Sequence, residues 1–391
     1  CGASACDEST LPPILQFDAS GKFVRAFGGG MFVFPHGIHI DRQGNVWVAD
    51  ASGKAGKGHV VVKFSPEGKV LMTLGKPGVK GNPPEALTEP TDVVTDPRNG
   101  DVLGFSSQPS YDPNAFASGI DRNAWNRLAN NEDRPLNDRA IQGTYSPGST
   151  FKMAVAAAAL EEGIITPDFK VYCPGHAVFY GRSFACSLPG GRGHGMVDLR
   201  HAIEDSCNVY FYTIGNMLGI DKIHKWATLL GLGEKTGIDL PNETQGLVPS
   251  PEWKRQNTKN HEKWYAGETI SVSIGQGAVW LTPVSEAVYI SALANGGTRV
   301  TPHLLKAIDE GTGWKPMPPP EPKSVVTLKQ DTIEAIRDGL WMVVNGTGTG
   351  GRAKIDGYDV SGKTGTAQVI SNEGAKAAKG KGTDKDLRDN G

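Results

Sequence analysis

The chain has 391 residues, of which 38% are hydrophobic and 21% charged, with 40 basic and 42 acidic side chains. This length predicts about two to three domains, and the near balance of charge gives no indication of a nucleic-acid-binding protein. No apolar run approaches the roughly 18 residues that a membrane span requires. The chain starts at Cys1 without an initiator methionine or a signal peptide, which indicates a processed or partial chain. Cys1 is then either the lipidated residue of a lipoprotein or the end of a fragment.

The first ninety or so residues contain an internal repeat. Residues 16–22 (QFDASGK) are matched by residues 63–69 (KFSPEGK), and residues 35–50 (PHGIHIDRQGNVWVAD) have a second copy that starts at Pro90 (PTDVVTDPRNGDVL). Alternating apolar residues broken by D-x-x-G turns predict short antiparallel strands. The pattern resembles β-propeller repeats of the NHL type. A propeller needs roughly 4–8 blades to close, and about two are present, so we expect an incomplete propeller fragment over residues 1–95.

A helix is expected over residues 149–162 (STFKMAVAAAALEE), which are rich in helix formers and follow Pro147-Gly148. Ser149 and Lys152 lie three residues apart and therefore share one face of this helix. A serine hydroxyl is a weak nucleophile until a base takes its proton. A lysine can act as that base when burial near other cations lowers its pKa. The helix N-terminus also directs free N–H groups at a developing oxyanion. Ser149 is thus a candidate nucleophile, and the alternative is a surface helix with a serine cap.

Two cysteines and two histidines gather in a short glycine-rich stretch. They are Cys173, His176, Cys186 and His194. Two thiolates and two imidazoles suit tetrahedral zinc, although their spacing matches no strong zinc-finger signature. A disulfide between Cys173 and Cys186 is the alternative in an oxidising compartment. His36 and His39 form a weaker candidate metal site, for which histidines of an ordinary strand and turn are the usual explanation.

The triplet Ser206-Cys207-Asn208 lies where a helical turn runs into an apolar aromatic stretch. Ser206 is suited to relay a proton to a leaving group, and Asn208 to hydrogen-bond a substrate amide. A triplet this short is usually an ordinary polar turn. It is, however, the only S-x-N in the chain, and it follows the only S-x-x-K. This order favours a functional role.

The triplet K-T-G occurs twice, starting at Lys235 and at Lys363. The residues around Lys363 alternate as in a strand, which would place Lys363 and Gly365 on one face and Thr364 and Thr366 on the other. The small Gly365 would let a substrate backbone approach closely. The copy at Lys235 lies in a glycine-rich connection and lacks the second threonine, so we interpret it as a structural loop.

In the order S-x-x-K, S-x-N, K-T-G, the three motifs form the signature of serine acyltransferases that react with penicillin. They and their surroundings resemble the transpeptidase domain of class B penicillin-binding proteins, of the penicillin-binding protein 2 type. The resemblance runs from about Asp96 to the last residue and includes DPRNGDVL, PSYDPNAF, DRAIQGTYSPGSTFK, GIDLPNE, SIGQG with LTP, and SGKTGTAQ. It implies an α+β fold of the serine β-lactamase type, with an antiparallel sheet flanked by helices, over residues 96–391.

The resemblance also implies an activity, D-Ala-D-Ala transpeptidation or carboxypeptidation in peptidoglycan synthesis. The serine would attack the penultimate D-Ala carbonyl, expel the terminal D-Ala and pass the acyl group to a neighbouring stem-peptide amine. The N–H groups of Ser149 and Thr366 would form the oxyanion hole. The side chains implied are a nucleophile (Ser149), a general base (Lys152), proton-transfer groups (Ser206 and Lys363) and carboxylate-binding groups (Thr364 and Thr366).

The same resemblance implies stem peptides as substrates, β-lactams as inhibitors and a membrane glycosyltransferase of the elongation machinery as partner. It implies no required cofactor, and a structural zinc would be an addition. It places the protein in the cell envelope, on the periplasmic side of the inner membrane, with a role in cell shape. We expect no membrane anchor among the residues of this chain, because none of its apolar runs is long enough.

The chain departs from the family pattern at both ends. Residues 96–103 (DPRNGDVL) satisfy both the repeat pattern and the start of the transpeptidase domain, which suggests a fusion or assembly artefact. The alternative is a genuine two-domain protein.

After K-T-G the chain continues into a polar, lysine-rich tail instead of the two further strands and helix of the family. Because an active site depends on preorganised donors, we expect weak or no acylation. The competing hypotheses are a β-lactamase or penicillin sensor, and an inactive truncated fusion with a propeller-type binding module.

Overall fold

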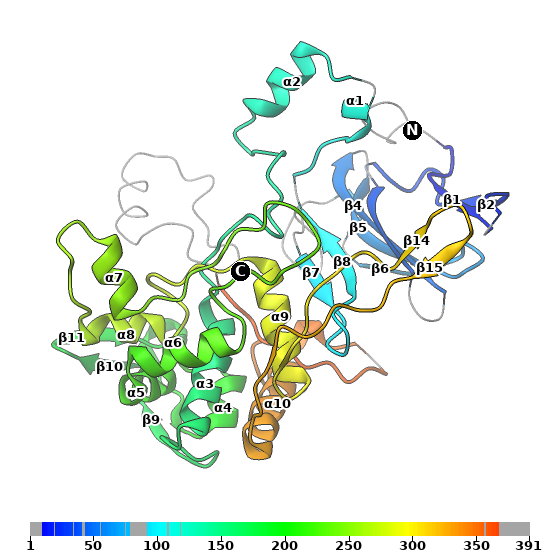
Figure 1. The fold of residues 1–391 in the computed structure, drawn as a ribbon. Helices are drawn as coiled ribbons and strands as arrows, with labels where there is room; N and C mark the ends of the chain where they lie inside the picture. Colours follow the sequence, from blue (N-terminus) through cyan, green and yellow to red (C-terminus); the bar gives the residue numbers. More distant parts are fainter. Residues whose placement is uncertain are drawn as a thin grey trace. The chain divides into compact units, whose positions relative to one another are not determined.

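The computed structural model describes residues 10–18, 20–33, 35–40, 44–54, 56–74, 76–78, 92–107, 109–117, 119–355 and 357–366. The chain divides into two compact units, whose elements are drawn in Figure 1. The first holds the described residues up to 94 together with residues 102–142. The second holds residues 95–101 and the described residues from 143 onward. Residues 102–142 therefore lie in the first unit, and the domain boundary expected at 95/96 stays a prediction.

Short antiparallel strands build the first unit. A hairpin pairs β1 (Ile14–Phe17) with β2 (Phe23–Phe27), a four-stranded sheet has the order β3-β4-β5-β6, and a further hairpin pairs β7 with β8. Helices α1 (Asn114–Ala117) and α2 (Arg122–Ala129) follow. The bounds of the remaining strands are β3 Pro35–Ile40, β4 Val46–Lys54, β5 Lys57–Phe64, β6 Val70–Leu74, β7 Asp92–Thr95 and β8 Val102–Ser106.

Two turns of this unit have the same hydrogen bonds. Asp18 N–H donates to Lys22 O at 2.9 Å, and Ser65 N–H donates to Lys69 O at 2.7 Å. In each turn the side-chain oxygen of the first residue also accepts from the backbone N–H four residues later. The glycine of each turn has a positive φ, 80° in one and 87° in the other, which an L-residue adopts only with strain. The internal repeat is therefore a structural repeat of hairpins, and the described residues form no closed propeller.

The first unit has a small core of its own. Strand β5 alternates between half-buried and buried residues, as expected of a strand with one face against a core. Phe64 and Phe32 lie at the centre of this core, with ring centroids 6.1 Å apart. The other buried residues of the cluster are Ile14, Val46, Val48, Val60 and Val62.

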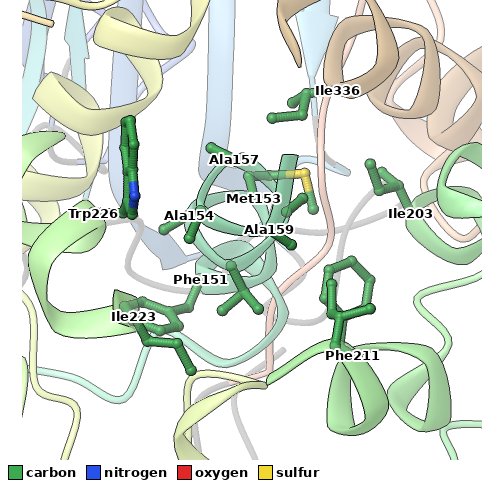
Figure 2. Packing of buried hydrophobic residues seen from close by; sticks show 14 of the residues in the cluster. Phe151, Met153, Ala154, Ala157, Ala159, Ile203, Phe211, Ile223, Trp226 and Ile336 are labelled. Carbon is green, nitrogen blue, oxygen red and sulfur yellow. The ribbon is translucent and has the colours of Figure 1, made fainter. Parts of the chain in front are cut away.

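Helix α3 (Lys152–Glu161) is the centre of the second unit. All of its residues except the last are buried, because KMAVAAAALE is apolar around nearly the whole helix. Figure 2 shows side chains from four other helices around it: Ile203, Phe211, Ile223 with Trp226, and Ile336. These helices are α4 (Leu199–Glu204), α5 (Asn208–Leu218), α6 (Ile220–Leu229) and α10 (Gln330–Asn345), and the others are α7 (Pro251–Asn257), α8 (Ala266–Val272) and α9 (Pro283–Ala294).

The helix expected over residues 149–162 is present, with a tighter first turn. Residues Gly148–Phe151 form a 3-10 turn, η1, that continues directly into α3. Ser149 is therefore in the turn that begins the helix. Tight 3-10 geometry is common at helix N-termini.

The strands of the second unit form four separate pairs instead of one sheet, as far as the described residues go. The pairs are β9 with β12, β10 with β11, β13 with β16 and β14 with β15. Their bounds are β9 Val171–Cys173, β10 His176–Phe179, β11 Arg182–Ala185, β12 Gly195–Val197, β13 Thr298–Arg299, β14 Ala307–Asp309, β15 Trp314–Pro316 and β16 Ser324–Val325. The α+β class is confirmed, whereas the single flanked sheet is not seen in the described part of the chain.

The strand expected around Lys363 is also not seen. Residues 359–366 carry no strand, because they pair with no other strand among the described residues, and residues from 367 onward lie outside them. Exposure nevertheless alternates along this segment, although the Lys363 amine reaches the Thr364 hydroxyl, so these two side chains do not lie on opposite faces. Lys363 and Gly365 are half-buried, whereas Thr364 and Thr366 are exposed. No helix within the described ranges is both long and apolar enough to cross a membrane.

Candidate active site

A chain of hydrogen bonds links the S-x-x-K and S-x-N motifs. The Ser206 hydroxyl lies 3.0 Å from Ser149 Oγ and donates to it. Lys152 Nζ donates to Ser206 Oγ at 3.0 Å, to Ser206 O at 2.8 Å and to Asn208 Oδ1 at 2.7 Å. Lys152 therefore reaches the candidate nucleophile through Ser206. The shared helix face of Ser149 and Lys152 does not by itself predict this intervening hydroxyl.

The polypeptide turns sharply at the S-x-N motif. Helix α4 ends at Glu204, and Asn208 is the first residue of α5. Between them Ser206 has a φ of 56°, a conformation that is uncommon for a residue other than glycine and that often occurs at functional sites. The Cys207 N–H donates to Ala202 O at 2.9 Å and fixes the turn. This turn presents Ser206 and Asn208 to the same lysine.

Burial lowers the pKa of both motif lysines. Lys152 is fully buried, and its pKa is lowered well below the usual value, first by desolvation and then by the positive charge of Lys363. Desolvation lowers the pKa of Lys363 to about 8. A lysine with a lowered pKa has a neutral fraction that can accept a proton near neutral pH. Lys152 thus has the environment that a general base requires.

Glycines let three backbone segments meet at the candidate nucleophile. Gly148 N–H donates to Gly275 O at 3.0 Å, and a Cβ on Gly275 would lie 2.1 Å from Gly148 O. A Cβ on Gly148 would in turn lie 2.4 Å from Thr366 O. Gln276 Nε2 also donates to Thr366 O at 3.3 Å. The SIGQG segment therefore holds the K-T-G segment beside the turn that carries Ser149, a role that sequence reasoning did not assign to it.

Helix α9 also holds the Ser149 turn, through Thr150. The Thr150 hydroxyl lies 3.2 Å from Glu286 Oε1, and the Tyr289 hydroxyl donates to Thr150 O at 3.1 Å. Desolvation raises the pKa of Glu286 to about 7. No motif marked Glu286 or Tyr289, because their contact with Thr150 spans more than 130 residues of sequence.

The K-T-G copy at Lys235 is a loop with internal support. The Glu243 carboxylate accepts from Thr236 N–H at 2.6 Å, from the Thr236 hydroxyl at 2.7 Å and from Gly237 N–H at 3.0 Å. Lys235 O accepts from Lys323 Nζ. These bonds fix the loop, in agreement with the structural interpretation of this copy.

Three cysteines and one histidine form a separate cluster next to the S-x-N motif. Their ligand atoms all lie within 4.8 Å of one another. His194 Nδ1 is 3.5 Å from Cys173 Sγ and 3.4 Å from Cys186 Sγ, and the sulfurs of Cys186 and Cys207 are 3.8 Å apart. Ligands at the usual zinc distances would be about 3.8 Å apart for two sulfurs and about 3.5 Å for sulfur and nitrogen in a tetrahedron. The cluster fits such an ion.

The structure changes the expected ligand set. Cys207 takes the place of His176, which is exposed at the start of β10. Strand alternation explains this, because β10 runs from exposed to half-buried residues in turn and its first side chain faces solvent. The Cys173–Cys186 disulfide is absent, since Cys173, Cys186 and Cys207 are all free thiols. The side chains of His36 and His39 lie outside the described residues.

Comparison with known proteins shows to which family the chain is similar. Residues 91–384 match the model of the penicillin-binding protein transpeptidase domain. The peptidoglycan D,D-transpeptidase MrdA of Acinetobacter baumannii is 41% identical over 280 residues, which cover 71% of this chain and 41% of that protein. The chain therefore spans less than half the length of this relative.

Solved structures agree with the sequence comparison. Penicillin-binding protein 2 of Pseudomonas aeruginosa, in complex with WCK 5153, is 39% identical with a TM-score of 0.65, over 71% of this chain and 60% of that one. Penicillin-binding protein 2 of Helicobacter pylori, in complex with MreC, is 30% identical with a TM-score of 0.62, over 79% of this chain and 59% of that one. The chain belongs to the penicillin-binding protein transpeptidase family, among its class B members of the penicillin-binding protein 2 and MrdA type.

Proposed function

We propose that this chain is a peptidoglycan D,D-transpeptidase domain that works through an acyl-enzyme on Ser149. The observation that carries the proposal is the chain of hydrogen bonds from the buried Lys152 through Ser206 to the half-buried Ser149. The domain proposed for this activity is residues 96–391. A β-lactam would acylate the same hydroxyl and be released slowly.

The mechanism follows from this geometry. With Lys152 neutral, the hydroxyl hydrogens reverse direction, so that Ser149 donates to Ser206 and Ser206 donates to Lys152 Nζ. As Ser149 Oγ bonds to the penultimate D-Ala carbonyl carbon, its proton passes along this chain to the lysine. The proton then returns to the amine of the terminal D-Ala as the peptide bond breaks. An amine of a second stem peptide attacks the ester and restores the Ser149 hydroxyl.

The K-T-G segment supplies the substrate-binding side of the proposed site. Thr366 N–H would form the oxyanion hole with Ser149 N–H, which is supported by the approach of the Thr366 backbone to Gly148. Thr364 and Thr366 would bind the substrate carboxylate, and Asn208 the substrate amide. Lys363, expected from the resemblance to transfer protons with Ser206, would instead supply positive charge beside Thr364. We propose the cell envelope as the location. As partners we propose a membrane glycosyltransferase and, because a relative is solved in complex with it, MreC.

The test is labelling of the whole chain with a fluorescent penicillin, followed by peptide mass mapping. We expect the adduct on the peptide that contains Ser149 and none after Ser149→Ala. Lys152→Ala should slow labelling by roughly 10²–10⁴-fold. Label that survives Ser149→Ala would reject the assignment. A folded wild-type chain that takes no label would favour the inactive fusion, and rapid loss of the label would favour a β-lactamase.

We also propose that Cys173, Cys186, His194 and Cys207 bind a structural zinc ion. The support is the set of distances within the cluster, in which His194 Nδ1 faces the sulfurs of Cys173 and Cys186. In the sequence, Cys207 stands between Ser206 and Asn208, whose side chains both contact Lys152. An ion held there would rigidify that turn, and it takes no part in the proposed reaction steps.

Metal analysis of the purified chain should find about one zinc per chain. Cys207→Ser and His194→Ala should lose it, whereas His176→Ala, the matched control, should keep it. Loss of zinc from His176→Ala with retention in Cys207→Ser would reject this ligand set. A chain two protons lighter under non-reducing conditions would instead show a disulfide.

For the first unit we propose that strands β3 to β6 form one propeller-type blade of the NHL kind. The support is their four-stranded antiparallel order and the repeated turn. Hydrogen exchange on the whole chain should then protect the amides of the central strands β4 and β5 more than those of β3 and β6. Equal exchange across the four strands would contradict the blade.

A further inference from the structure

The loop after helix α10 is wrapped around one buried carboxylate. Glu204, at the end of α4, accepts from Thr347 N–H at 2.8 Å and from the Thr347 hydroxyl at 3.2 Å. Its carbonyl oxygen accepts from Thr349 N–H at 3.3 Å. A Cβ on Gly346 would lie 2.4 Å from Glu204 Oε1, and a Cβ on Gly348 2.9 Å from Glu204 Cγ. The backbone of this loop therefore has little room to move away from Glu204.

This loop brings a hydroxyl to the K-T-G motif. Thr349 Oγ1 lies 2.8 Å from Thr364 Oγ1, and both side chains are exposed. Lys363 Nζ lies 3.4 Å from the same Thr364 oxygen and donates to it. Two hydroxyls and an ammonium group thus gather on the exposed side of K-T-G. Such a set is suited to an anion, because each member can donate a hydrogen bond.

The number of hydrogens and lone pairs decides what Thr349 does. An ammonium group can only donate, so Thr364 Oγ1 is the acceptor towards Lys363. A hydroxyl oxygen has two lone pairs, so it can also accept from Thr349. When Thr364 Oγ1 accepts from both Lys363 and Thr349, its own hydrogen remains free to be donated to a ligand. Donation from Thr349 also polarises the Thr364 hydroxyl and strengthens its own hydrogen bond.

We propose that Thr349 is a positioning residue of the carboxylate subsite, which directs the Thr364 hydroxyl to the terminal carboxylate of an acyl-D-Ala-D-Ala ligand. Glu204 holds Thr349 in place, because its carbonyl oxygen accepts from Thr349 N–H. The inference rests on the proposed function, because that function supplies the ligand.

The experiment measures binding without the chemical step. The whole chain carrying Ser149→Ala is titrated with an N-acylated D-Ala-D-Ala dipeptide and with its C-terminal carboxamide, which differ in the carboxylate alone. Adding Thr349→Val deletes the hydroxyl and keeps the shape of the side chain. Thr349→Ser restores the hydroxyl. Thr312→Val, on the exposed β14–β15 turn, is the matched control.

Thr349→Val should weaken binding of the carboxylate ligand by about two- to tenfold, as expected for the loss of one hydrogen bond between two hydroxyls. Binding of the carboxamide should not change, Thr349→Ser should bind as the parent does, and Thr312→Val should have no effect. Equal weakening of both ligands would mean that Thr349 is merely structural, and no weakening of either would also overturn the proposal. A parent chain that does not prefer the carboxylate overturns it as well. In that case penicillin labelling of Ser149 shows separately whether the proposed function stands.

Discussion

Burial lowers the pKa of Lys152 more than that of Lys363, and we assign the two lysines different roles for this reason. Lys152 is surrounded by acceptors and fully buried, with its Nζ also 5.4 Å from the Phe211 ring centroid. Lys363 is half-buried at the edge of the site. The desolvation cost falls on the charged form, so it is larger for Lys152. In the proposed reaction Lys152 therefore acts as the neutral base, and Lys363 supplies positive charge.

The pH dependence of the acylation rate should reflect the loss of a proton from each of the two lysines. The rate should rise with pH as Lys152 loses its proton, at a pH well below the usual lysine pKa. It should fall again through an apparent pKa of about 8, because Lys363 loses its charge there. Second-order rate constants for penicillin acylation between pH 5 and 10 measure both limbs.

Lys363→Arg is the control for the descending limb. A guanidinium group stays charged throughout this range, so the fall near pH 8 should disappear even if the maximum rate is lower. An unchanged descending limb in Lys363→Arg would show that another group causes it.

At the scale of elements, close helix contacts depend on small side chains. Helices α5 and α8 approach each other where Gly215 faces Ser273, and a Cβ on Gly215 would lie 2.3 Å from the Ser273 Cβ. Ser273 is fully buried, so it has no space to move into. The apolar α3 follows the same rule, because five of its ten residues are alanines.

Gly215→Ala should therefore destabilise the second unit. Alanine favours the helix by about 1 kcal/mol relative to glycine, but overpacking in a core costs about 1–3 kcal/mol or more. A contact of 2.3 Å makes the steric cost the larger of the two. Thermal and urea unfolding measure the change.

Gly267→Ala, in α8, is the matched control. Its Cβ would meet no atom closer than 3.7 Å, so this variant should be as stable as the parent or more stable. Equal effects of the two substitutions would contradict the steric explanation.

At the scale of the whole molecule, the described residues contain two hydrophobic cores that share no residue. One surrounds Phe64 and Phe32 in the first unit, and the other surrounds α3 in the second. All of the proposed catalytic residues belong to the second unit. We therefore expect that the stability of the first unit can be changed without changing the activity of the second.

Phe64→Ala should cost the first unit about 3–5 kcal/mol, as is usual for the loss of a buried ring, while penicillin labelling of Ser149 stays at the parental rate. Hydrogen exchange of the β4 and β5 amides measures the loss of stability, and the labelling assay measures the site. A parallel loss of labelling in the folded variant would show that the two units depend on each other.

Local sequence was sufficient to predict those structural features that depend on interactions between neighbouring residues. The helix that starts at Ser149, the loop at Lys235 and the repeated hairpin turns all follow from residue types within a few positions of one another. The alternation of exposure around Lys363 follows in the same way. The three motifs also indicated the family, because their order is specific even though each is short.

Only the tertiary structure decided which side chains meet. Cys207 replaces His176 in the cluster, Ser206 stands between Lys152 and Ser149, and Glu204 brings Thr349 to Thr364. Each of these contacts joins residues that lie far apart in the chain or on different elements. Their proximity depends on how helices and loops pack, including the close approach that glycines such as Gly275 allow. Patterns of neighbouring residues contain no record of such packing, because many sequence-distant partners are compatible with the same local structure.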